Sequence, residues 1–193
     1  MLRYMPETIR SFVAFDIDSQ QVLAKLREVQ DILSKSGADL KLVEPQNIHI
    51  TLRFLGDITQ SMVDRIGQEM QSITFKSFDV EIKGIGTFPN LRHAKVIWAG
   101  IRGGEKELSR IFDQLEPRLR LLGFAPDSRG FSPHLTVARV KSGRNKSELT
   151  KAVTEMSAFE FGKVQAKSLR LKKSVLTPRG PIYSILKEAH AVK

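Results

Sequence analysis

A short motif occurs twice in this chain, at matching distances from an apolar segment upstream. His49 and His134 each begin an apolar segment, and each is followed by a threonine two positions later. Phe12 precedes His49 by 37 positions, and Ile97 precedes His134 by the same number. A segment order that recurs at a fixed spacing is typical of a duplicated structural unit. The sequence therefore predicts two copies of one unit, with the two histidines at equivalent positions.

Each copy shows the same order of apolar patterns. Short apolar runs predict strands, and apolar residues three and four positions apart predict helices. Ser19 is a good N-cap for the first helix and Gly37 a good stop, whereas Pro117 predicts a kink or a fresh start in a later helix. The expected strands are 10–17, 49–56, 78–88, 94–100, 131–140, 162–176 and 181–189, and the expected helices are 19–37, 59–73, 105–122 and 146–157.

The order of these segments predicts an α+β protein with two similar β-α-β-α-β lobes. The first repeat covers about 10–90 and the second about 95–188. No flexible linker or low-complexity stretch separates them, so we expect one domain over 1–193, with its two lobes related by a pseudo-two-fold axis.

The composition favours a polyanionic ligand. Lys and Arg number 31 against 21 Asp and Glu, which gives a net charge of +10. The chain has no cysteine, which excludes disulfides, thiolate metal sites and cysteine nucleophiles. No apolar run approaches the roughly 18–20 residues that span a bilayer, and the first ten residues lack the apolar core of a signal peptide. We therefore expect a cytoplasmic protein that does not associate with membranes.

Strand geometry gives the two motifs their chemical meaning. Residues i and i+2 of a strand point to the same face, so Thr51 projects beside His49 and Thr136 beside His134. Histidine exchanges protons near neutral pH, and a threonine hydroxyl can donate to a phosphate oxygen. One His-x-Thr alone is commonly a half-buried histidine with no such role, but two equivalent copies predict one shared site. We expect an acid and a base acting on a phosphate, with no metal and no cofactor.

Both motifs resemble the paired signatures of the 2H phosphoesterase superfamily. More narrowly, the chain resembles the bacterial and archaeal RNA 2′,3′-cyclic phosphodiesterases, long called 2′-5′ RNA ligases. The residues before Arg10 depart from that family. The resemblance implies antiparallel-rich sheets that line a central cleft, with strands exchanged between the lobes. The stretches that carry it are 47–56 and 131–139 around the motifs, with 10–15, 86–89, 96–100, 174–178 and 180–183.

The resemblance also implies a reaction and a role for each motif residue. The substrate would be a 2′,3′-cyclic phosphate on an RNA end or a nucleotide, opened by water to a 2′-phosphate. His49 would be the proton donor and His134 the proton acceptor, whereas the residues themselves do not orient the pair. Thr51, Thr136 and Arg139 would hold the phosphate, and a guanidinium is well shaped for that task.

Other residues are candidates for substrate contacts. Arg53 lies two positions past Thr51, so an ideal strand gives it the face of His49. Phe54, Phe131 and Tyr183 could stack on a base, although such aromatics are more often core residues.

Three further features carry less information. Trp98 stands inside an apolar strand and is expected in the core. The cluster of Arg170, Lys172 and Lys173 fits either an RNA path or a solvated strand face, and 100–104 is interpreted as a turn rather than a dinucleotide loop.

The sequence leaves two alternative functions open. One is 2′-5′ RNA ligation by the reverse chemistry, and the other is a non-catalytic module that binds RNA or nucleotides. The expected partner in every case is RNA or a nucleotide, and the expected oligomeric state is a monomer.

Overall fold

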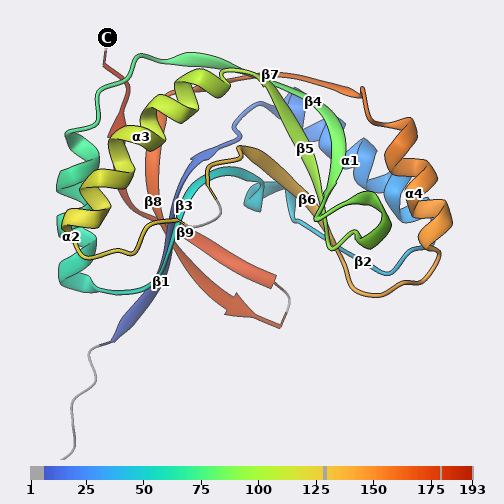
Figure 1. The fold of residues 1–193 in the computed structure, drawn as a ribbon, viewed down its shortest axis with the longest axis horizontal. Helices are drawn as coiled ribbons and strands as arrows, with labels where there is room; N and C mark the ends of the chain where they lie inside the picture. Colours follow the sequence, from blue (N-terminus) through green and yellow to red (C-terminus); the bar gives the residue numbers. More distant parts are fainter. Residues whose placement is uncertain (1–6, 128–129, 179, 193) are drawn as a thin grey trace, which may run out of the picture.

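The computed structural model describes residues 7–127, 130–178 and 180–192 of the chain. These residues form an arch, in which one curled sheet is flanked on its outer side by helices (Figure 1). The elements in chain order are β1 (Thr8–Asp16), α1 (Gln20–Lys35), β2 (Leu40–Leu42), η1 (Pro45–Asn47), β3 (His49–Thr59), α2 (Gln60–Gln71), β4 (Phe78–Phe88), η2 (Leu91–His93), β5 (Val96–Gly103), α3 (Glu105–Leu121), β6 (His134–Val140), α4 (Lys146–Glu155), β7 (Glu160–Ala166), β8 (Ser168–Thr177) and β9 (Gly180–His190). The α+β class predicted from the sequence is confirmed.

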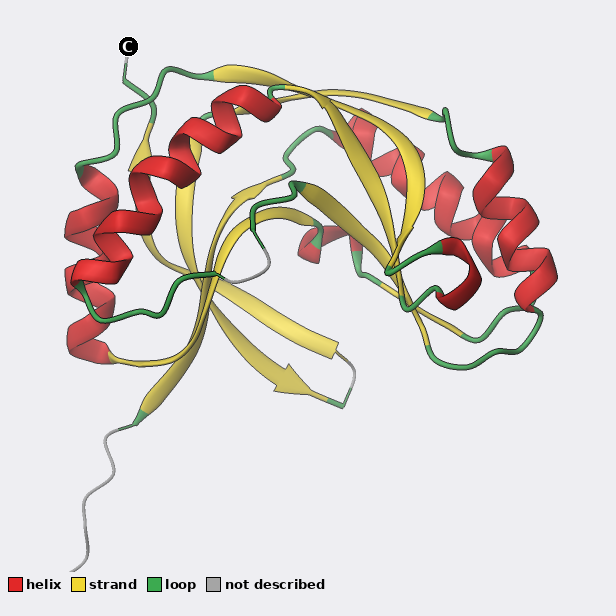
Figure 2. Cartoon of the chain, in the orientation of Figure 1, coloured by secondary structure: helices red, strands yellow, loops and turns green. Residues whose placement is uncertain are grey.

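All pairings between the strands of the sheet are antiparallel. The strand order is β7-β4-β5-β6-β3-β1-β8-β9, and β2 pairs with β6 off this main path. Helices α2 and α3 cover the half that contains β3, β1, β8 and β9, whereas α1 and α4 cover the other half (Figure 2). The four helices α1 to α4 lie on the outer side of the sheet, so they do not cover the side chains on the concave side of the central strands (Figure 2).

Strands from each repeat contribute to both halves of the sheet. β4 comes from the first repeat but pairs with β5 and β7, and β8 comes from the second repeat but pairs with β1. On these pairings, we propose that the chain forms one bilobal domain with strands exchanged between its lobes.

Apolar side chains of the strands and helices form one continuous core. Ile50, Leu52, Leu135 and Val137 are all buried in it, as their alternation with the motif residues predicts. The helices begin where capping residues occur, since the Ser19 side chain accepts from the Val22 amide at the start of α1.

Helix α3 is continuous from Glu105 to Leu121 across Pro117, with buried Leu115 and Leu119 on either side, so it has no fresh start there, and the alternative of a kink stays a prediction. Two other element predictions are wrong. The expected strand 162–176 is two strands, which separate at Lys167 as the chain leaves β4 for β1. Between the first expected helix and the expected strand 49–56, where no strand is predicted, the structure contains β2.

Phe12 and Ile97 do not occupy equivalent positions in the sheet, although each lies 37 positions before a motif histidine. Phe12 lies opposite Phe54, five positions past the first histidine, whereas Ile97 lies opposite Ala138, four positions past the second. The true counterpart of Phe12 is Val96, which lies opposite Arg139. The chain between the paired strands is therefore one residue longer in the second copy, since Asp16 pairs with His49 and Gly100 pairs with His134.

Candidate active site

The two motifs meet at the centre of the sheet. β3 and β6 pair antiparallel through one residue pair, Ile50 with Leu135, which are the middle residues of the two motifs. An antiparallel register about that pair places His49 toward Thr136 and His134 toward Thr51. Because Ile50 and Leu135 point into the core, the four polar side chains point to the concave side, away from helices α1 to α4. The sheet thus brings together the four residues that the sequence predicted to converge.

Each histidine is oriented by the same local hydrogen bond. His49 Nδ1 lies 2.7 Å from the Asn47 carbonyl oxygen, and His134 Nδ1 lies 2.8 Å from the Ser132 carbonyl oxygen. A carbonyl oxygen only accepts, so Nδ1 carries the proton in both rings. The neutral tautomer therefore leaves each Nε2 as a proton acceptor.

The surroundings disfavour the protonated form of both imidazoles, because they lower the pKa of each. Burial lowers the pKa of His49 to about 4, against the Asn47 hydrogen bond, and the Lys172 charge acts in the same direction as burial. Burial also lowers the pKa of His134, and the Arg139 charge adds to that effect. The His134 charge contributes to lowering the pKa of His49, as expected for two rings in one site.

A β-bulge in each motif strand determines which later residues share the motif face. Leu52 has no partner between the pairs of Thr51 and Arg53 in β3, and Val137 has none between the pairs of Thr136 and Ala138 in β6. A bulge residue shifts the alternation of all residues after it. In β6, Val137 and Ala138 are therefore both buried, and the following residue returns to the motif face.

Arg139 is that residue, and the bulge explains how it reaches the motif face from three positions past Thr136. It is exposed; burial and the Arg139 charge together lower the pKa of His134, whereas burial raises the pKa of Tyr183 against the charge of Arg139. The structure therefore places a guanidinium near His134, where it could hold a phosphate.

The same kind of bulge takes Arg53 off the motif face, which corrects the expectation from ideal alternation. Its Nε lies 3.0 Å from a carboxylate oxygen of Glu116 in α3, and its guanidinium also bonds the Ala125 carbonyl oxygen. Asp127 lies 3.8 Å from the same group. Arg53 opposes core residue Val13 and ties β3 to α3 on the helix-covered side.

Aromatic rings surround His49 on the motif face. Phe12 stacks on the imidazole with ring centroids 4.7 Å apart, and Tyr183 of β9 meets the same imidazole edge-on at 5.4 Å. Phe54 extends the wall, 6.0 Å from Phe12, and 52% of it is exposed. The structure thus brings Tyr183 and Phe54 to the site, and it adds Phe12, which the sequence analysis had used only to define the repeat.

His134 has its own aromatic neighbours. Phe88 meets its ring edge-on at 5.0 Å, and Trp98 lies beside Phe88 at 5.2 Å. Trp98 is only half-buried and lies opposite Thr136, so its assignment to the core is wrong. Alternation along β5 alone could not reveal this, because both faces of that strand are apolar. Phe131 stacks flat on Phe112 of α3 instead, with ring centroids 4.8 Å apart.

A buried ion-pair cluster adjoins His49. Lys172 Nζ lies 2.5 Å from one Asp16 carboxylate oxygen, and Arg170 donates to the other at 2.7 Å. Burial alone would raise the pKa of Asp16, but these two cations hold it below its usual value. Lys172 is 5% exposed and also lies 5.8 Å from the centre of the Tyr183 ring.

This cluster rules out the two earlier interpretations of Lys172 as a member of an RNA path or of a solvated face. Asp16 itself gave no sequence signal, because a carboxylate at the end of a strand is ordinary. Its position opposite His49 in the β1–β3 pairing is what makes it part of the site.

No group of three or more His, Asp or Glu in the described part of the chain could hold a metal ion. In the same residues, no helix is long and apolar enough to cross a membrane.

Comparison with known proteins places this site in a family. The family model described as LigT like Phosphoesterase matches residues 17–98 and 102–183, so each match contains one motif. The chain belongs to this family of 2H phosphoesterases.

Its relatives narrow the class further. The RNA 2′,3′-cyclic phosphodiesterase of Aeropyrum pernix is 41% identical over 88% of this chain and 97% of its own length. The enzyme of the same name from Archaeoglobus fulgidus is 38% identical over 93% and 98% of the two chains. This chain is an enzyme of that phosphodiesterase class.

Solved structures share the fold at lower identity. A protein of Thermus thermophilus superposes with a TM-score of 0.76 at 24% identity, over 94% of this chain and 97% of that one. E. coli LigT complexed with 3′-AMP gives a TM-score of 0.76 at 21% identity, over 97% and 100% of the two chains.

Proposed function

We propose that this protein hydrolyses the 2′,3′-cyclic phosphate of RNA ends or nucleotides to a 2′-phosphate without a metal ion. The observation that carries the proposal is the meeting of the two motifs at Ile50 and Leu135, with both histidine Nε2 atoms left unprotonated. The names of the archaeal relatives support the substrate, and the 3′-AMP complex of E. coli LigT supports a nucleotide ligand.

The reaction uses one histidine to remove a proton and the other to supply one. His134 Nε2 takes a proton from water as the water oxygen attacks phosphorus. The bond from phosphorus to O3′ breaks, and His49 gives its proton to that oxygen. Thr51, Thr136 and Arg139 hold the non-bridging oxygens, whose charge grows in the transition state.

The donor role requires that His49 be protonated when substrate is bound. Its lowered pKa keeps it neutral in the free protein, so the substrate must supply the compensation. A phosphate anion close to the imidazole raises its pKa, because an opposite charge favours the protonated form. Substrate binding and proton uptake are therefore coupled at this site.

A sulfur-substituted substrate tests the assignment of roles. When sulfur replaces the bridging O3′ of a 2′,3′-cyclic nucleotide, the thiolate leaves without needing a proton. His49→Ala should then recover most of its lost rate relative to wild type, whereas His134→Ala should not. Recovery by His134→Ala alone would reverse the assignment. Adding RNA with a 5′-hydroxyl group to the same assay measures ligation, which the same residues could perform in reverse.

We also propose a cellular location and an oligomeric state for the enzyme. A cysteine-free chain that acts on RNA ends fits a cytoplasmic enzyme. A complete site within one chain fits a monomer, which sedimentation velocity would test.

A further inference from the structure

The exposed side chain of Arg10 projects from the concave side of the sheet, on the same face as the motif residues. Arg10 lies two positions before Phe12 in β1, and side chains two positions apart in a strand share a face. Phe12 stacks on the His49 imidazole, so the face that it shares with Arg10 is the motif face. Ile9 and Ser11, which alternate with Arg10, are buried. The register of β1 therefore adds a cation to the motif face, outside the residues that hold the cyclic phosphate.

The sheet divides at the position of Arg10. The last pair between β1 and β8 on this side is Ser11 with Lys173. Beyond that pair, β1 continues only along β3, and β8 continues only along β9. Figure 1 shows the start of β1 and the β8–β9 hairpin diverging from each other. Ser174, the next residue of β8, pairs with Tyr183, so Arg10 and Tyr183 lie on the two sides of this division.

Two exposed arginines act on Tyr183. Burial raises the pKa of Tyr183, and the charges of Arg139 and Arg10 act against burial. Within residues 7–127, 130–178 and 180–192, Arg10 forms no ion pair, although Asp57 is its cross-strand residue. Arg139 is already assigned to the cyclic phosphate. An exposed guanidinium without an ion pair in this part of the chain suits a second phosphate, which it can bind through two parallel hydrogen bonds.

The proposed reaction gives the direction in which a second phosphate lies. In an in-line displacement, the attacking water and the leaving O3′ lie on opposite sides of phosphorus. His134 acts on the water and His49 on O3′, so C3′ and the sugar carbons that lead to the 5′ phosphate lie on the side of His49. Arg10 is on that side, because β1 pairs with β3 on the edge away from β6. It lies roughly 7 Å along β1 from Phe12, the residue that stacks on His49.

We propose that Arg10 binds the 5′ phosphate of the terminal nucleotide while the cyclic phosphate occupies the His49–His134 site. An RNA chain continues through this 5′ phosphate. Arg10 would therefore let the enzyme distinguish an RNA end from a nucleoside 2′,3′-cyclic phosphate that has a free 5′-hydroxyl. The proposal rests on the function proposed above, and in particular on His49 as the proton donor. The alternative is that Arg10 is a solvated surface residue that binds no ligand.

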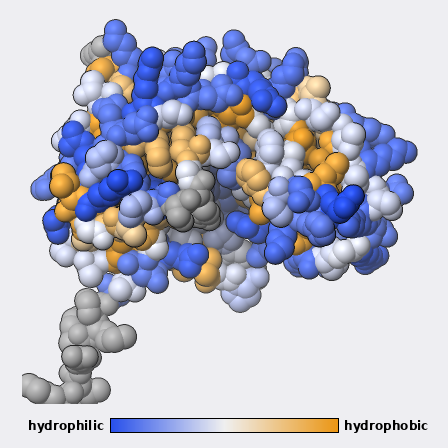
Figure 3. Space-filling model, viewed as in Figure 1, coloured by the Kyte–Doolittle hydropathy of each residue, from blue (hydrophilic) through white to orange (hydrophobic). Residues whose placement is uncertain are grey.

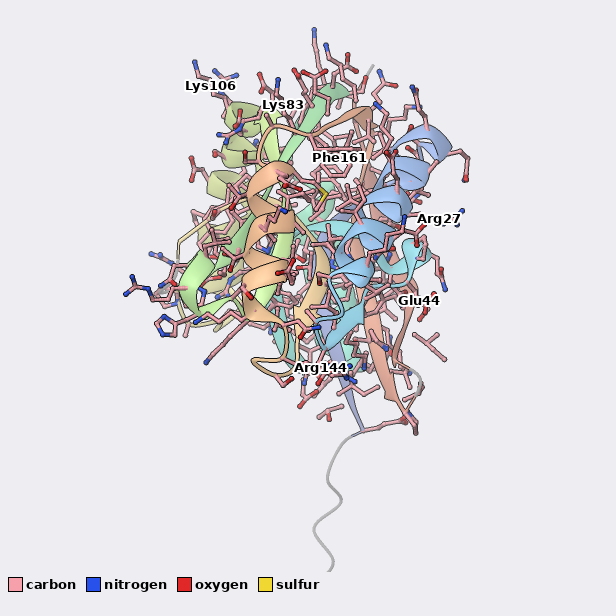
Figure 4. All side chains as sticks on the ribbon, turned by 90° about the vertical axis from the view of Figure 1, so that its right-hand side faces the viewer. Arg27, Glu44, Lys83, Lys106, Arg144 and Phe161 are labelled. Carbon is pink, nitrogen blue, oxygen red and sulfur yellow. The ribbon has the colours of Figure 1, made fainter. Side chains whose placement is uncertain are left out.

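Two single variants with equal charge change test the proposal. Arg10→Gln removes the guanidinium that would bind the 5′ phosphate. Lys106→Gln removes an exposed charge at the start of α3, and Lys106 lies at the opposite end of the molecule from the start of β1 (Figure 4). A third variant, Arg10→Lys, keeps the charge but loses the planar guanidinium, so it should keep only part of the effect.

The substrates are adenosine 2′,3′-cyclic phosphate with a 5′-hydroxyl, the same nucleotide with a 5′-phosphate, and a dinucleotide that ends in the same cyclic phosphate. In wild type, the 5′-phosphate should raise kcat/KM about tenfold over the 5′-hydroxyl, as one hydrogen-bonded contact with a charged group does. Arg10→Gln should abolish this preference, and Lys106→Gln should keep it. The dinucleotide, whose 5′ phosphate is a diester, should show the same preference in wild type and the same loss in Arg10→Gln.

A wild-type enzyme without the preference would overturn the proposal, and so would an unchanged preference in Arg10→Gln. Equal losses in Arg10→Gln and Lys106→Gln would also overturn it, because they would show a general effect of net charge. A preference that the dinucleotide does not share would contradict recognition of an RNA chain.

Isothermal titration with adenosine 2′-phosphate and adenosine 2′,5′-bisphosphate separates this proposal from the catalytic one, because binding requires no turnover. Wild type should bind the bisphosphate about tenfold more tightly, and Arg10→Gln alone should lose that difference. If wild type hydrolyses none of the three substrates, the proposed function fails. The same difference in Kd would then still support Arg10 as a residue that binds the 5′ phosphate, and equal Kd values would overturn that role.

Discussion

At the residue scale, the two histidines share a hydrogen bond pattern and differ in their surroundings. Both present Nε2 because Nδ1 donates to the carbonyl oxygen two positions earlier. His49 lies between Phe12 and Tyr183 and near the Lys172 cation, so its protonated form is strongly disfavoured. His134 faces Arg139 and is less deeply enclosed. The equivalent positions of the two motifs bring the histidines together, and their different neighbours make the two rings differ in burial and in nearby charge.

Part of the decrease in the free energy of unfolding in acid should come from protonation of His49. Its folded-state pKa of about 4 lies below its unfolded value near 6.5, so the unfolded chain binds the extra proton between these pH values. Unfolding is thereby favoured as pH falls through this window, by roughly 3 kcal/mol at pH 4 or below. His49→Gln should remove that part of the decline in urea melts between pH 7 and 4.

Lys172 should tune His49 directly. Lys172→Met removes a buried cation whose charge lowers the pKa of His49, so that pKa should rise, as followed by NMR titration of the imidazole. Lys173→Met changes the next residue, which pairs with Ser11 on the other face, and should leave the titration unchanged. An equal shift in both variants would mean that net charge, rather than the buried cluster, sets the pKa.

At the element scale, the two bulged strands decide which residues the site contains. Alternation from the sequence correctly places Thr51 and Thr136 with their histidines, because no bulge intervenes before them. It fails for Arg53 and Arg139, because the bulges at Leu52 and Val137 put each of them on the face opposite to the one that alternation alone gives. Those residues are an ordinary leucine and valine, so no local signal in the sequence marks either bulge.

The pairing of β3 with β6 should be sensitive to Ile50. This buried side chain sits at the single paired position, so Ile50→Ala leaves a cavity beneath both motifs and should cost about 2–5 kcal/mol in unfolding free energy. Ile50→Val should cost about 0.5–1.5 kcal/mol and keep the motifs aligned. Urea unfolding measures both. If Ile50→Ala were as stable as Ile50→Val, the junction would not depend on this contact.

At the scale of the whole molecule, strands of the two repeats pair with each other, since β4 pairs with β5 and β7, and β8 pairs with β1. The sequence predicts the order and type of most elements, because their apolar periodicity is local. It does not predict that the backbone crosses from β7 to β8 at Lys167, since no glycine or proline marks the break. Hydrophilic side chains cover much of the face seen in Figure 3, which agrees with the net charge of +10.

The exchanged strands should make the two halves unfold together. Trp98 is the one tryptophan and lies in β5, so its fluorescence reports on that half of the sheet. Far-UV circular dichroism reports on both halves. The two signals should show coincident transitions in urea. Separate transitions would contradict the proposal of a single domain.

The central claim is that His49 and His134 act together on one phosphate, and single-turnover rates test it most directly. The measurement compares wild type, His49→Ala, His134→Ala and the double variant on a 2′,3′-cyclic mononucleotide in the presence of a chelator. Wild type should hydrolyse it to the 2′-phosphate, and each single variant should lose at least about 100-fold. The double variant should be little slower than either single one, because residues that act as a unit are not additive. A single variant that keeps near-wild-type rate would contradict the account.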